Sequence, residues 1–185
     1  MTEDEVVKLA KGKYGSMKSR CGKEKAYLDV KICDEWLENS QMFIDFTLDW
    51  WRQGYFPEGF EIDKDILGNG KLYSPSTCCY VPSRLNLFFV NCQTDPYKDM
   101  RRIQYDEWQD KYYAQAAWCG RSIVVSYCDC EVDALIDYIL FKRKVGGKIL
   151  ADNRGKIHPK VVEAVEKFGE MELSYWYDRR INQYY

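Results

Sequence analysis

The stretch from Glu61 to Asn86 most constrains the fold of this 185-residue chain. A short apolar run ends at Asp63, and a loop rich in Gly and Asn follows it. A second short apolar run then leads into a helix start near Asn86. Short apolar runs separated by Gly and Asn are typical of strands joined by a turn, so the stretch predicts strand, loop, strand and helix in that order.

The residues before this stretch predict a mainly helical segment. Acidic residues after Thr2 indicate a helix start. The expected elements are a helix over Glu3–Lys11 that ends near Gly12, a second helical piece over Tyr14–Cys21, an extended segment over Tyr27–Cys33, and a helix from Glu35 that is broken near Asn39–Ser40. The apolar positions expected on the buried face of this last helix are Trp36, Leu37, Phe43, Ile44, Phe46 and Leu48.

The second half of the chain follows a break at Gln93–Pro96 and an expected linker to about Tyr105. Its pattern predicts a β-hairpin and then helices. The expected elements are strands over Tyr112–Trp118 and Arg121–Tyr127, a helix over Glu131–Lys144 ended by Gly146–Gly147, a short helix over Lys148–Asn153, and a helix over Pro159–Phe168. We therefore expect an α+β fold with two domains, residues 1–95 and 106–185.

Composition excludes little about function. The formal net charge of −2 indicates no general attraction to nucleic acid, although a local basic face could still exist. No apolar run is long enough to span a membrane, and no apolar signal segment opens the chain, so we expect a cytoplasmic protein with no membrane partner. In that setting the eight cysteines are expected to be reduced and mostly buried, with a structural zinc site as the alternative.

Several short motifs between Tyr14 and Phe89 form a set. They are Ser16–Cys21, Val30–Trp36, the helix with Phe43 and Phe46, Asp63–Gly70, Tyr73–Val81 and Asn86. Together they resemble phage-type HNH endonucleases related to homing nucleases. The resemblance implies a ββα-metal unit in which Asp63 and Asn86 hold Mg²⁺ or Mn²⁺ on the scissile phosphate. A loop brace or a helix hydrogen bond is the structural alternative for these two residues.

Two positions depart from the family pattern. Lys64 stands where the family has its catalytic His, and Thr77 aligns with the central Asn. An ordinary lysine is protonated at neutral pH, so it binds phosphate more readily than it deprotonates water. A lysine whose pKa is lowered by burial could still act as a base. The pattern therefore favours a catalytically inactive or impaired nuclease over an active metal-dependent DNA endonuclease.

The hairpin and helix of the second half resemble, at the level of pattern, the APETALA-type DNA-binding domain that accompanies phage HNH nucleases. The resemblance covers roughly Lys111–Glu172 and would place a third short strand near Ser126–Cys130. It implies that the sheet reads DNA, with Lys111, Trp118 and Arg121 as the candidate contacts. Further basic residues at Lys142, Arg143 and Lys144 are either nucleic-acid contacts or a solvated helix end.

Three functions remain open from the sequence. The first is an HNH-derived phage protein without effective cleavage that binds nucleic acid or a host protein that handles nucleic acid. The second is a scaffold that inhibits a host defence or nucleic-acid enzyme through protein–protein contact. The third is an active metal-dependent endonuclease.

Overall fold

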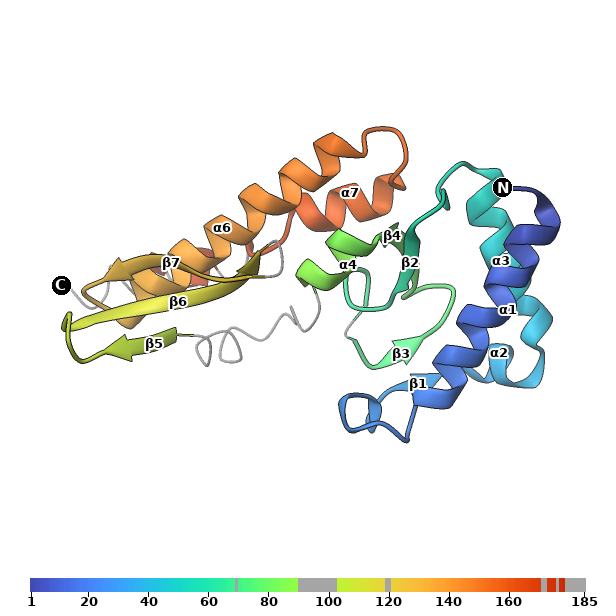
Figure 1. The fold of residues 1–185 in the computed structure, drawn as a ribbon, viewed down its shortest axis with the longest axis horizontal. Helices are drawn as coiled ribbons and strands as arrows, with labels where there is room; N and C mark the ends of the chain where they lie inside the picture. Colours follow the sequence, from blue (N-terminus) through green and yellow to red (C-terminus); the bar gives the residue numbers. More distant parts are fainter. Residues whose placement is uncertain (69, 90–102, 119–120, 171–172, 176, 179–185) are drawn as a thin grey trace. The chain divides into compact units, whose positions relative to one another are not determined.

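The computed structural model describes the whole chain except residues 69, 90–102, 119–120, 171–172, 176 and 179–185. The chain is a mixed α+β protein, and it divides into two compact units (Figure 1). The first unit combines Met1–Asn91 with Asp152–Ala164, and the second combines Cys92–Ala151 with Val165–Tyr185. Within the first unit, the ring of His158 lies 4.8 Å from the rings of both Trp50 and Tyr55, which connects Asp152–Ala164 to the N-terminal residues.

Helix α1 (Glu3–Arg20) is continuous, so the predicted break near Gly12 is wrong. It starts with a capping box in which the Thr2 and Glu5 side chains each accept a backbone N–H of the other residue. Buried side chains at Val6, Ala10 and Met17 extend along the helix on both sides of Gly12. Burial of this face offsets the roughly 1 kcal/mol that a glycine costs within a helix.

Helices α2 (Asp34–Glu38) and α3 (Ser40–Arg52) surround an aromatic core, and the predicted break at Asn39–Ser40 is confirmed. The Asn39 side chain caps α3 by accepting the backbone N–H of Gln41 at 3.0 Å. The Trp36 ring meets the Phe43 ring edge-on at 4.9 Å. Most positions predicted for the buried face are buried or half-buried, but Leu37 of α2 is 45% exposed.

The predicted order of strand, loop, strand and helix over Glu61–Asn86 is confirmed. Strand β2 (Phe60–Asp63) pairs antiparallel with β4 (Cys79–Pro82), which places Asp63 opposite Cys79, and helix α4 (Ser83–Phe89) follows β4 directly.

The extended segment predicted over Tyr27–Cys33 is largely wrong. Lys25–Tyr27 forms a 3₁₀ turn, and only β1 (Lys31–Ile32) pairs, in parallel with β3 (Leu72–Tyr73). The alternating pattern predicted a longer strand, but the pairing is only as long as β3.

The second unit contains a three-stranded antiparallel sheet in the order β5 (Ile103–Asp106), β6 (Lys111–Trp118) and β7 (Arg121–Cys128). The hairpin is confirmed. The third strand precedes the hairpin, so its expected position near Ser126–Cys130 is wrong, and β5 occupies the end of the segment predicted as a linker. The break at Gln93–Pro96 lies outside the described residues.

Helix α6 (Glu131–Asp152) covers one face of this sheet (Figure 1). The buried Ala114 and Ala116 of β6 belong to one core with Leu135, Ile136 and Ile139 of the helix. The predicted helix end at Gly146–Gly147 is wrong because the apolar face of α6 continues through Val145 and Ile149. Helix α7 (Pro159–Glu166) is the last helix whose bounds are described. No helix in the described part of the chain is long and apolar enough to cross a membrane.

Replacing Gly12 or Gly147 with Ala tests the continuity of α1 and α6. Both glycines are exposed within a helix, and an added Cβ would meet no atom within 4 Å. Because Ala loses less backbone entropy than Gly in a helix, each change is expected to raise the free energy of unfolding by about 0.5–1 kcal/mol. Urea denaturation of Gly12→Ala and Gly147→Ala measures this; a lower stability than wild type would contradict continuous helices.

Candidate functional site

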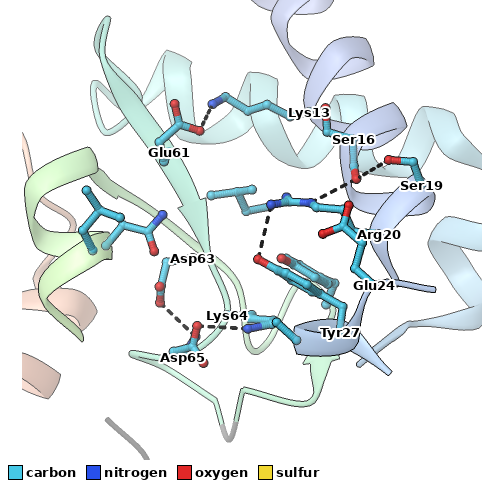
Figure 2. A pocket seen from close by; sticks show the side chains of 15 residues that line it. Lys13, Ser16, Ser19, Arg20, Glu24, Tyr27, Glu61, Asp63, Lys64 and Asp65 are labelled. Atoms are coloured by element: carbon cyan, nitrogen blue, oxygen red, sulfur yellow. Dashed lines mark hydrogen bonds and ion pairs between the residues drawn. The ribbon is translucent and has the colours of Figure 1, made fainter. Parts of the chain in front are cut away.

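A cavity of about 600 Å³ in the first unit contains the residues that the sequence singled out in β2 and α4 (Figure 2). Its walls are α1, the turn after α1, β2 with the two residues that follow it, Tyr73 of β3, and Asn86 and Leu87 of α4. The polar residues that line it are Lys13, Ser16, Ser19, Arg20, Glu24, Tyr27, Glu61, Asp63, Lys64, Asp65, Tyr73 and Asn86. The fold therefore brings Asp63, Lys64 and Asn86 to one cavity.

Asp63 ends β2 and is only 2% exposed. Its Oδ1 accepts the backbone N–H groups of Asp65 at 2.9 Å and Ile66 at 2.7 Å. Its Oδ2 is buried and has no hydrogen-bond partner in the described part of the chain. Burial raises the pKa of this carboxyl to about 6, against the opposing effect of the two N–H groups. At neutral pH Asp63 therefore presents a largely ionised, unpartnered oxygen.

Asn86 lies on α4 and lines the same cavity. The side-chain amide of Asn86 makes no hydrogen bond to another described residue, so its oxygen is available to a ligand. A buried orphan carboxylate oxygen and an amide oxygen are hard donors of the kind that Mg²⁺ and Mn²⁺ take, with water or phosphate filling the remaining positions. The residues present therefore fit a site with few protein ligands.

A metal site enclosed by protein ligands does not fit the described residues. They contain no group of three or more His, Cys, Asp or Glu side chains placed to hold an ion. The six described cysteines are free thiols, and two of them, Cys78 and Cys79, are buried.

Lys64 is buried, at the position where the resemblance to HNH nucleases would place the catalytic base. Its Nζ lies 3.0 Å from the Asp65 Oδ2. The same nitrogen lies 5.5 Å from the centre of the Tyr27 ring and 5.6 Å from that of Tyr73. A carboxylate and the faces of two aromatic rings therefore surround the Lys64 amine. Lys64 thus lies on the wall of the cavity with its partners supplied by the protein itself.

Thr77 braces the loop that joins β2 to β4. Its Oγ1 donates to the Leu72 carbonyl at 2.7 Å and accepts the backbone N–H of Ser74 at 3.1 Å. The other side of Thr77 packs on Gly68, where an added Cβ would lie 2.9 Å from the Thr77 Cβ and 2.7 Å from the Lys64 carbonyl oxygen. Thr77 therefore shapes the loop from outside the cavity and does not line it.

The α1 wall of the cavity was not predicted from the sequence. It contributes Lys13, Ser16 and Arg20, and the turn after α1 contributes Tyr27. Lys13 is paired with Glu61 at 2.5 Å. A polar stripe on a helix has the same pattern whether it faces solvent or a cavity, so only the packing of α1 beside β2 could reveal these residues.

The six candidate nucleic-acid contacts occupy different environments in the second unit. Lys111 forms an ion pair with Asp129, and Arg121 is exposed. Lys142 is buried with its Nζ 5.8 Å from the Tyr138 ring, Arg143 donates to the Phe168 carbonyl and pairs with Glu170, and Lys144 is exposed. The side chain of Trp118 lies outside the described residues.

Beyond the Asp106–Lys111 pair at one end, the face of the sheet opposite α6 carries uncharged side chains. Gln104, Tyr113 and Tyr127 stand side by side, because Tyr113 pairs with both of the others across the strands. The Tyr113 and Tyr127 rings lie 5.5 Å apart. Gln115, Ser122 and Val124 continue the same face. We call these six residues the outer face of the sheet.

No protein-family model matches this chain, and comparison with curated proteins and with solved structures gave no match either.

Replacing Asp63 with Asn tests the cost of the buried carboxylate. A pKa raised to about 6 in the folded state, against about 3.9 in the unfolded state, means that the folded form binds more protons between these values. The stability of the wild type should therefore fall as pH rises from about 4 through about 6. The amide introduced by Asp63→Asn keeps an oxygen that can accept the two N–H groups, but it cannot ionise.

In urea denaturation without divalent metal, the free energy of unfolding of Asp63→Asn at about pH 7 is expected to be higher than that of the wild type by on the order of 2 kcal/mol. The difference should be smaller at about pH 4. The same change at Asp29, whose side chain is 80% exposed, should alter stability by less than about 0.5 kcal/mol. A variant less stable than wild type at neutral pH would contradict this account of Asp63.

Proposed function

We propose that this chain is an HNH-derived protein of phage type that binds nucleic acid through the Asp63 cavity and has lost effective cleavage. One observation carries the proposal. Asp63 offers an unpartnered oxygen in the cavity that Asn86 also lines, while Lys64, at the position where the resemblance places the base, is ion-paired with Asp65. Ligands for a metal are retained, and the group that would activate water is not.

The strand, strand and helix of β2, β4 and α4 support the HNH ancestry. Their order agrees with the ββα-metal arrangement that the motifs imply, with Asp63 at the end of the first strand and Asn86 on the helix. Thr77 fixes the intervening loop, which is the task that the family gives to its central Asn. The three-stranded sheet with α6 packed on one face similarly supports the APETALA-type resemblance of the second half.

The charges of the cavity indicate how phosphate binding would depend on metal. The charges cancel within the Lys13–Glu61 pair and within the Lys64–Asp65 pair. The remaining charged side chains of the lining are Arg20, which is positive, and Glu24 and the ionised Asp63, which are negative. The lining as a whole therefore has no excess of positive charge, although Arg20 within it has no ion-pair partner among the described residues. Asp63 and Asn86 would hold a divalent ion, and an ion there would supply the positive charge that a phosphodiester needs. Binding is thus expected to require Mg²⁺ or Mn²⁺.

Plasmid DNA with Mg²⁺ or Mn²⁺ tests binding and cleavage together. The wild-type protein is expected to bind without nicking the plasmid. Lys64→His is expected to gain nicking by about 10²-fold or more over wild type, because a positioned base contributes that much to proton transfer. Gel electrophoresis of the supercoiled and nicked forms measures the gain.

Asp63→Ala in the Lys64→His background serves as the control and should abolish the gained activity. Metal-dependent nicking by the wild type that disappears in Asp63→Ala would instead establish an active endonuclease. The absence of DNA binding at low salt with Mg²⁺ would contradict the proposal.

A second candidate is inhibition of a host defence or nucleic-acid enzyme through protein contact, and the outer face of the sheet favours it. Phosphate contacts supply most non-specific affinity for DNA, and this face offers amides, hydroxyls and tyrosine rings in place of cations. Tyrosine is enriched in protein interfaces because it buries a large ring and keeps a polar tip. Tyr127 is 44% exposed on this face.

Affinity capture from a bacterial host lysate tests the second candidate. A stoichiometric partner is expected with the wild type and is expected to be lost with Tyr127→Asp, because a new charge would be desolvated at the interface. Leu140→Asp is the matched control, since Leu140 is 43% exposed on α6. Loss of the partner with both variants, or no partner with the wild type, would count against this face as an interface.

A further inference from the structure

We propose that Arg20 forms a phosphate-binding subsite in the Asp63 cavity, which would hold a phosphodiester group beside the metal position. The choice of a phosphodiester as the ligand rests on the proposed function. The availability of Arg20 for an anion rests on its own geometry.

Three contacts fix the guanidinium group of Arg20 in place (Figure 2). Its Nε donates to the Ser16 carbonyl at 3.1 Å, and its Nη1 donates to the Tyr27 hydroxyl at 3.2 Å. The plane of the group lies over the Tyr27 ring, with Cζ 4.8 Å from the ring centre. The group is therefore positioned before any ligand arrives, so binding loses little side-chain entropy.

The other cations near the cavity already have carboxylate partners. Lys13 pairs with Glu61, and Lys64 pairs with Asp65. For Arg20, by contrast, no carboxylate of the described residues lies within ion-pair distance, and its Nη2 donates to none of them. A half-buried guanidinium that faces a cavity without a counter-ion is an anion site.

The shape and surroundings of the site favour phosphate. The free side of a guanidinium matches two oxygens of one phosphate, and the Ser16 hydroxyl, which donates to no described residue, lines the same wall. Arg20 covers one face of the Tyr27 ring, and Lys64 also lies within 5.5 Å of that ring. Tyr27 is thus engaged with cations, and the subsite is expected to bind the backbone of nucleic acid without reading its sequence.

Fluorescence anisotropy with a labelled short DNA duplex in Mg²⁺, titrated from about 50 to 200 mM salt, tests the subsite. Arg20→Lys keeps the charge but loses the planar fork, so affinity should fall about tenfold with an unchanged salt slope. Arg20→Ala also loses the charge, so the slope of log K against log salt should decrease by about 1. Thermal denaturation of each variant verifies folding.

Arg52→Lys and Arg52→Ala are the matched controls, because Arg52 is 53% exposed, pairs with Glu3 and does not line the cavity. Both should bind DNA as the wild type does. If Arg20→Lys and Arg20→Ala also bind as the wild type does, the subsite is overturned.

Two further arms separate this inference from the proposed function and identify the source of the phosphate. Loss of binding in Asp63→Asn with no loss in the Arg20 variants would overturn the subsite and leave the proposed function standing. Loss of DNA binding in the Arg20 variants, with no effect of Asp63→Asn or of metal removal, would support the subsite and overturn the proposed function. As competitors, a dinucleoside monophosphate should displace the duplex more strongly than inorganic phosphate; the opposite order would overturn assignment to a phosphodiester.

Discussion

The first unit depends on how the carboxylate of Asp63 is buried. One oxygen is taken by the backbone N–H groups of Asp65 and Ile66, and these two hydrogen bonds turn the chain at the end of β2. The other oxygen has no partner among the described residues, so the fold carries an ionisable group whose burial raises its pKa to about 6. A buried polar atom left unsatisfied opposes folding, and such groups persist where a ligand compensates for them. Asp63 therefore differs from an ordinary loop brace, because its second oxygen lowers the stability of the fold and remains available to a ligand.

In the same loop, Lys64 and the residues that support the loop make separate side-chain contacts. Lys64 is surrounded by the Asp65 carboxylate and by the rings of Tyr27 and Tyr73, so its charge is compensated within the protein. Thr77 and Gly68 hold the loop by hydrogen bonds and close packing that do not involve the cavity. The contacts of the Lys64 side chain and the support of the loop are therefore physically separate, so a substitution at Lys64 need not disturb the loop.

The two units present different chemistry to a partner. The cavity of the first unit combines hard oxygen donors with a positioned guanidinium, which suits a phosphate and a divalent ion. In the second unit, the outer face of the sheet offers amides, hydroxyls and tyrosine rings, and Lys111 beside it is already paired with Asp129. Nucleic-acid binding is therefore better supported in the half that resembles a nuclease than in the half that resembles a DNA-binding domain.

The sequence alone determined the elements whose signals are local. Apolar runs bounded by Gly and Asn predicted β2, β4 and α4, the break at Asn39–Ser40 predicted the start of α3, and the hairpin of β6 and β7 followed from its apolar strands and Gly turn. Glycine misled the prediction at Gly12 and Gly146–Gly147, because propensity is local whereas the burial that holds these helices together is not. Strand β5 lacked a signal of its own, since only pairing with β6 makes it a strand. The motifs could nominate Asp63, Lys64 and Asn86 as site residues. Only the tertiary structure decided that one Asp63 oxygen has no hydrogen-bond partner among the described residues, that Lys64 is ion-paired with Asp65, and that Arg20 has no carboxylate within ion-pair distance. Each of these depends on which distant side chains come within a few ångströms, and a linear pattern does not contain that information.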